Sequence, residues 1–339
     1  MSIRIETVLA ATGGSLLNNP AVSRFEGIAL TIKEVTRGSL FIATDPTEIS
    51  EALAAGAYGI AADFKLPIAD DEVAWIRWPD TSEALPRLLR PWLVENPRTV
   101  VLVERPTLLF IASIARPGAC HILDASALEM SKMLLRSDPE RPIICADHVF
   151  LDRIGVVPLP PSFAPSMVKV VAQTPFRTSL ILEERYYPQL PLLPCLLDPF
   201  LEAIATLKSL SCPYDPAHVE YTDTAMPLYL DSWGRETAPE EATHLLLLVD
   251  RPHCGCMDHF QRIAWTRRTL LLPSQIKLEC AIKSTTIHYD GERDLAEKTA
   301  TFLKNPGYMM IVGMTKDRFL TLLTRYGLGR SPYRTQGLF

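Results

Sequence analysis

The densest group of potential metal ligands in this 339-residue sequence is His253-Cys254-Gly255-Cys256-Met257-Asp258-His259. Thiolates combined with imidazoles suit zinc or copper, and a glycine between the cysteines would let the backbone fold around an ion. However, the cysteines are separated by one residue rather than the usual two, and no second cysteine pair lies nearby. Two interpretations stay open, a loop of buried residues or a zinc site made by His253, Cys254, Cys256 and His259.

Two further cysteines lie close to histidines, because Cys120 precedes His121 and Cys145 precedes His148 by three residues. A thiol beside an imidazole can act as a nucleophile with its base. No third residue at a suitable spacing orients either imidazole, and both cysteines adjoin apolar strands. The spacing therefore favours a structural role, and no residue is assigned to catalysis.

Length and composition place the chain among globular proteins with more than one domain. Hydrophobic residues make up 47% and charged residues 22%, and prolines cluster near 158–165, 188–199 and 213–227. We expect domains at 1–98, 99–212 and 213–339. The net charge of -5 provides no basic surface for nucleic acid.

The chain has no apolar run of the length that a membrane span needs, and its N-terminus lacks the pattern of a secretion signal. Its seven scattered cysteines do not form a disulfide framework of the secreted kind. These features predict a cytoplasmic protein.

Helical and strand patterns alternate along the chain, as in α/β proteins with parallel sheets. The expected strands are 27–33, 39–43, 57–62, 73–77, 99–103, 141–145, 244–249, 275–281 and 308–312. The expected helices are 2–12, 46–55, 81–93, 126–136, 196–210, 295–304 and 316–326.

One segment carries a family resemblance. It reads Val35-Thr-Arg-Gly38-Ser-Leu40-Phe41-Ile-Ala43 and is followed by a helical pattern that ends at Gly56-Ala57. It resembles the first domain of the Mur ligases that add a dipeptide to a UDP-muramoyl tripeptide, where the motif is D-S-R-x-V-x-x-G-x-L-F-x-A. Residues 145–155 and 176–210 resemble later segments of that family in the same order. The resemblance implies a three-domain Mur-ligase-like α/β architecture with a central, mostly parallel sheet flanked by helices.

The phosphate-binding loop of that family is missing. In Mur ligases a buried strand leads into T-G-x-x-G-K-T, whose backbone N–H groups cradle the ATP phosphates. Here the corresponding strand leads into Glu104-Arg-Pro-Thr-Leu-Leu-Phe110, without glycine or lysine, and no G-x-x-x-x-G-K-[ST] occurs elsewhere. Phosphoryl transfer depends on positioning and charge neutralisation, so we expect no ATP cofactor and no ATP-driven ligation.

The resemblance also suggests where a ligand would bind. The D-S-R element, which in the family helps hold the uridine nucleotide, falls on Thr31-Ile32-Lys33, where only the basic third position remains. The candidate ligand-binding residues are then Thr31, Lys33, Gly38 and Phe41. The expected partner is a UDP-muramoyl-peptide or a protein of cell-wall synthesis.

Three functions are consistent with these patterns. The first is a non-catalytic Mur-ligase-like protein that binds or scaffolds around peptidoglycan precursor synthesis. The second is an enzyme with ATP-independent, metal-assisted chemistry in an inter-domain cleft. The third is a partner-binding protein unrelated to the cell wall.

Overall fold

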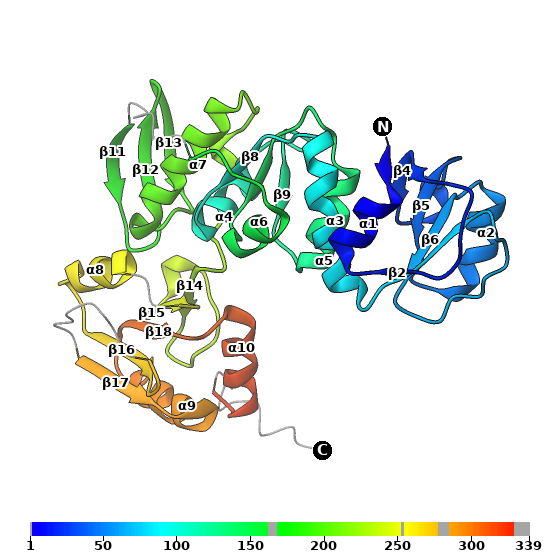
Figure 1. Cartoon of the computed structure of the whole chain (residues 1–339). Helices are drawn as coiled ribbons and strands as arrows, with labels where there is room; N and C mark the ends of the chain where they lie inside the picture. The colour runs from blue at the N-terminus through cyan, green and yellow to red at the C-terminus, as the bar shows by residue number, and fades with distance from the viewer. Residues whose placement is uncertain (1, 162–167, 252–253, 277–284, 329–339) are drawn as a thin grey trace, which may run out of the picture. The chain divides into compact units, whose positions relative to one another are not determined.

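The computed structural model describes residues 2–161, 168–251, 254–276 and 285–328 (Figure 1). The chain divides into one compact unit of Met1–Leu108 with Arg116–Pro161 and another of Leu109–Ala115 with Ser162–Phe339. The division into three domains stays a prediction. Among the described helices, none is both long and apolar enough to cross a lipid bilayer.

The first unit begins with a sheet of strand order β2-β7-β6-β5-β4, which is parallel except where β2 meets β7. Its strands are β2 (Ser15–Leu16), β4 (Gly27–Ala29), β5 (Ser39–Ile42), β6 (Gly59–Ala62) and β7 (Ala74–Arg77). Beside it lie the short pair β1 (Ile3–Arg4) and β3 (Arg24–Phe25), the helices α1 (Ile5–Thr12) and α2 (Ile49–Ala54), and the 3-10 turns η1 (Ile32–Glu34) and η2 (Pro46–Glu48). Every residue of β5 and β6 is buried, as expected for strands covered on both faces.

The same unit holds a second, parallel sheet of order β8-β10-β9. Its elements are β8 (Val100–Leu102), α4 (Arg105–Ile114), β9 (His121–Leu123), α5 (Ala127–Arg136), β10 (Ile143–Cys145) and α6 (His148–Ile154). Leu159 returns beside β8 in a parallel bridge to Val101. All three strands point the same way, so their carboxyl ends meet at one edge.

Helix α3 (Thr81–Glu95) joins these two sheets, because it packs against α1 on one side and against α5 and α6 on the other (Figure 1). Leu85 and Leu88 enter the core of the first sheet, whereas Leu89 and Leu93 enter the core of the second. Each buried leucine contributes about 1.5–3 kcal/mol, so the shared helix couples the two cores strongly.

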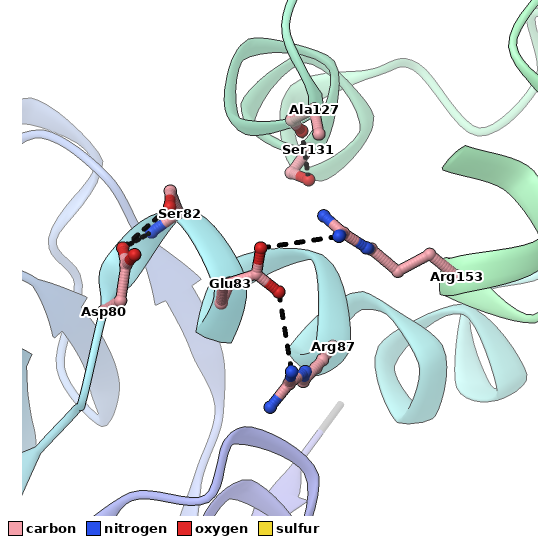
Figure 2. Close-up of polar contacts among 7 residues, drawn as sticks. All are labelled: Asp80, Ser82, Glu83, Arg87, Ala127, Ser131 and Arg153. Carbon is pink, nitrogen blue, oxygen red and sulfur yellow. Dashed lines mark hydrogen bonds and ion pairs between the residues drawn. The ribbon is translucent and has the colours of Figure 1, made fainter. Parts of the chain in front are cut away.

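Hydrogen bonds and ion pairs accompany the apolar packing of these helices. Glu83 of α3 accepts a hydrogen bond from Arg153 of α6 at 3.4 Å and pairs with Arg87 one turn along at 3.5 Å (Figure 2). Ser131 is fully buried in α5, and its hydroxyl donates to the Ala127 carbonyl at 2.7 Å. These partners satisfy polar groups at the helix contacts, where an unmet hydroxyl would be costly.

The second unit contains an antiparallel sheet of order β11-β12-β13, followed by η3 and α7. Its elements are β11 (Val168–Gln173), β12 (Thr178–Leu182), β13 (Arg185–Leu190), η3 (Pro194–Leu196) and α7 (Leu197–Ser209). The ring of Phe200 on α7 packs edge-on against Phe110, with ring centroids 5.6 Å apart. The second half of α4 therefore belongs to the core of this unit.

The rest of the second unit is a sheet of order β14-β15-β18-β16-β17, which is parallel except for β14. Its elements are η4 (Pro216–His218), β14 (Ala225–Leu230), η5 (Pro239–Glu241), β15 (His244–Val249), α8 (Cys254–Arg262), β16 (Arg268–Pro273), β17 (Thr285–Tyr289), α9 (Gly291–Phe302), β18 (Gly307–Val312) and α10 (Lys316–Arg325). On one face, Met309 and Ile311 share a core with Leu295 of α9 and Phe319 of α10. On the other face, Tyr308 packs against Phe260 of α8.

The predicted α/β fold class is confirmed, and most expected helices and strands occur within a few residues of their predicted bounds. The strand expected at 27–33 is wrong beyond Ala29, since Ile32–Glu34 form a 3-10 turn. Helix α4 was not predicted, and it begins at Arg105, with two residues between it and the end of strand β8. Most of the strand expected at 275–281 lies outside the described residues.

Candidate functional site

The carboxyl edge of the β8-β10-β9 sheet is the place where ligands bind in open parallel α/β sheets. Glu104 follows β8, Asp124 follows β9, and Asp147 follows β10. Any ligand at this edge would therefore meet three carboxylate side chains that follow the strands.

The connection from β8 to α4 consists of Val103 and Glu104 alone. The Val103 N–H donates to the Cys145 carbonyl at 3.0 Å, so this residue still continues the sheet. The Glu104 carbonyl accepts the Leu108 N–H at 3.0 Å and thus already belongs to the helix. Two residues, neither of them glycine, therefore join the strand to the helix.

The charges at this edge are mainly negative. Arg105 contributes a guanidinium, but it pairs with Asp124 at 2.7 Å across the end of the central strand. The Asp147 carboxylate accepts the Phe150 N–H at 2.9 Å and caps α6. Since Glu104 adds a third carboxylate at the surface, the local field opposes a phosphate.

The structure places Cys145, His148 and His121 in different surroundings. Cys145 is fully buried, and burial raises the pKa of its thiol, so the nucleophilic thiolate is disfavoured. His148 is exposed at the start of α6. The Nε2 atom of His121 accepts the Asp138 N–H at 3.2 Å, so this ring nitrogen already has a hydrogen-bond partner.

The predicted ligand residues in the first sheet fall into two environments. Thr31 and Lys33 lie at the surface around η1, whereas Phe41 is fully buried in β5. Gly38 is buried and has φ +93°, and an added Cβ would lie 2.9 Å from Glu26 Cγ. The structure thus brings Thr31 and Lys33 to one surface turn, whereas Gly38 directly precedes the buried strand β5 and Phe41 lies within it.

Glu34 fixes this surface turn. Its carboxylate accepts the N–H groups of Leu30 at 2.9 Å and Thr31 at 3.2 Å and pairs with Arg136 of α5 at 2.6 Å. Burial alone would raise the pKa of Glu34, but these hydrogen bonds and the guanidinium outweigh it and lower the pKa. The turn that carries Thr31 and Lys33 is consequently held against the second sheet's helix.

The predicted metal ligands are only partly described. His253 lies outside the described residues, and so does the side chain of Cys254. Cys256 is fully buried with its Sγ 2.7 Å from Cys195 Sγ, and His259 Nε2 donates to the Pro175 carbonyl at 3.0 Å. Burial lowers the pKa of His259, so its ring is neutral near pH 7. Within the described part of the chain, no three His, Cys, Asp or Glu side chains gather around a common point.

Sequence reasoning missed two pairs, Glu34 with Arg136 and Cys195 with Cys256. Their members are far apart in the chain, and local periodicity carries no signal for such contacts. The carboxylate of Glu34 three residues after Thr31 was a usable sign of a helical turn, because it matches a capping box.

No model of a known protein family matches the chain, and no curated protein matches it by sequence. A solved structure of MurF from Acinetobacter baumannii is similar with a TM-score of 0.49 and 11% identity, covering 96% of this chain and 98% of that one. The MurF ligase from Thermotoga maritima, in complex with ADP, is similar with a TM-score of 0.45 and 14% identity, covering 88% and 96%.

A UDP-N-acetylmuramoyl-L-alanyl-D-glutamate–2,6-diaminopimelate ligase gives a TM-score of 0.36 at 11% identity, covering 93% and 94%. These likenesses extend over nearly the whole chain, but TM-scores below 0.5 do not assign a family to it.

Proposed function

We propose that this chain is a non-catalytic Mur-ligase-like protein that binds a cell-wall precursor or a protein of precursor synthesis and does not use ATP. The observation that carries the proposal is the connection between β8 and α4, which has two residues and no glycine. The sequence resemblance at residues 35–57 supports the link to UDP-muramoyl peptides.

The surface turn at Thr31 and Lys33 is the part of the proposed site that can contact a ligand. Lys33 is exposed and would offer a cation to the diphosphate of a UDP-sugar, while Thr31 would offer a hydroxyl. Glu34 and Arg136 hold this turn in place, so its backbone is fixed before a ligand arrives. A fixed site loses less entropy on binding.

The test is a thermal-shift series on the full chain with UDP-muramoyl tripeptide, UDP, and ATP with Mg²⁺. A ligand at about one hundred times its Kd stabilises the bound fold by roughly 2.7 kcal/mol. For a unit of this size, that corresponds to a rise in melting temperature of roughly 5–10 °C. We expect such a rise with the UDP-sugar peptide and none with ATP.

Lys33→Ala should abolish most of the shift. Lys65→Ala is the matched control, because Lys65 is also exposed in the first sheet's loops and lies outside the proposed site. A Mg²⁺-dependent shift with ATP, or release of phosphate from ATP by the purified chain, would refute the non-catalytic assignment. If the UDP-sugar peptide has no effect while Lys33→Ala weakens capture of a cell-wall synthesis protein, the protein partner is the ligand.

A further inference from the structure

Two cysteines from separate parts of the second unit meet in its interior. Cys195 lies in η3, and Cys256 lies in α8, 61 residues further along the chain. Their Sγ atoms are 2.7 Å apart. A disulfide has an S–S distance of about 2.05 Å, so the sulfurs are within about 0.7 Å of bonding.

Buried aromatic residues adjoin this pair, and Tyr308 lies near both thiols. Phe260, one turn after Cys256, is fully buried, and its ring lies 5.0 Å from the ring of Tyr308. Cys256 has no exposed surface, whereas Cys195 is half-buried. A small oxidant can therefore reach Cys195 first, and Cys256 is the partner that lies within bonding reach.

We propose that Cys195 and Cys256 form a reversible disulfide when the protein meets a hydroperoxide. The bond would close the chain segment that contains α7, β14 and β15. It would thereby tie the segment after the β11-β12-β13 sheet to the helix that covers the larger sheet. Oxidation would lock together two layers of this unit that otherwise touch only through non-covalent contacts.

The chemistry balances in two steps. The Cys195 thiolate attacks one peroxide oxygen and breaks the O–O bond, which gives a sulfenic acid and hydroxide. The Cys256 thiol then attacks the sulfenic sulfur, forms the S–S bond and releases water. The two thiols are oxidised, and hydrogen peroxide is reduced to two waters.

The reaction is expected to be slow. The hydrogen bond with Cys256 and burial both raise the pKa of the Cys195 thiol, so little thiolate is present near neutral pH. Once formed, the bond is shielded by the same aromatic side chains, and a small dithiol reductant is needed to reverse it.

The test uses the full chain, treated with hydrogen peroxide and then denatured and alkylated. Of the seven cysteines in the sequence, five should remain titratable after oxidation and all seven after dithiothreitol. Mass spectrometry of a non-reduced digest should show the peptides of Cys195 and Cys256 joined, with the mass lowered by two hydrogens. The melting temperature should rise on oxidation and return on reduction.

Cys195→Ser is the main variant, because the half-buried position tolerates a similar side chain better than the buried one does. It should lose the linked peptide and the rise in melting temperature, whereas the control Cys120→Ser should keep both. Seven titratable thiols after peroxide treatment would overturn the proposal. A bridge from Cys195 to Cys254 instead of Cys256 would overturn it equally.

Discussion

Removing the hydroxyl of Tyr308 on β18 should stabilise the second unit. The side chain is fully buried, and its hydroxyl has no hydrogen-bond partner among the described residues. Burial raises the pKa of Tyr308 well above its ordinary value, so the group is neutral. An unsatisfied buried polar group costs about 1–3 kcal/mol, which Tyr308→Phe should recover. For a unit of this size, the melting temperature should rise by roughly 2–10 °C.

Tyr289→Phe is the matched control on β17, a strand of the same sheet that is separated from β18 by β16. The Tyr289 hydroxyl donates to the Val312 carbonyl at 2.6 Å, and both groups are buried. Removing this hydroxyl should destabilise the fold by about 0.5–1.5 kcal/mol, so the same Tyr→Phe change should lower stability at Tyr289 and raise it at Tyr308. Scanning calorimetry of the full chain at pH 7, read at the transition of the second unit, measures both variants. A destabilised Tyr308→Phe variant, with Tyr289→Phe unchanged, would refute the reasoning.

Three further predictions concern the first unit. Gly59→Ala should destabilise this unit by about 1–3 kcal/mol in urea unfolding, because an added Cβ would lie 2.4 Å from a Phe25 ring carbon. Gly27→Ala is the control and should be nearly neutral, because a Cβ added there meets no atom within 4 Å. Glu34 has a lowered pKa, so its carboxylate stabilises the fold above its unfolded value of 4.5 and the gain is lost as pH falls through the lower folded value. Urea midpoints between pH 7 and pH 3 should therefore fall less for Glu34→Gln than for the natural chain. Asp147→Ala removes the cap of α6 and should cost about 1 kcal/mol, measured by the urea midpoint at pH 7.

Local sequence patterns were enough to predict the α/β class and most of the helices, but fewer than half of the described strands. The strand β15 was predicted at its observed bounds, because His244–Val249 is a continuous apolar run with a single polar end. The antiparallel strands β11 and β13 were missed, since most of their residues are exposed and carry no apolar alternation. Their pairing depends on β12, which is almost wholly buried, and such tertiary support is invisible in one short window.

The segment that lacks the glycine-rich motif forms the start of helix α4 and not a loop. Glu104-Arg-Pro lacks glycine, yet it leads directly into a helix. Proline is well tolerated in the first turn of a helix because the N–H that it lacks would have no partner there. Pro106 takes that position, and the helix begins directly after the strand. Pro106 thus has no N–H to offer a phosphate and also allows the helix to begin directly after the strand.

The candidate sites depend on contacts that no spacing rule anticipates. Cys256 was grouped with its sequence neighbours because a dense Cys and His run is typical of metal sites. In the folded chain its thiol turns instead toward Cys195, since α8 places Cys256 and Phe260 on the buried face that covers the sheet. A helix turns residues that are adjacent in sequence onto different faces, so Cys256 and its neighbours along α8 do not all point the same way. The thiol pair follows from the packing of α8 on η3, which only the tertiary structure determines.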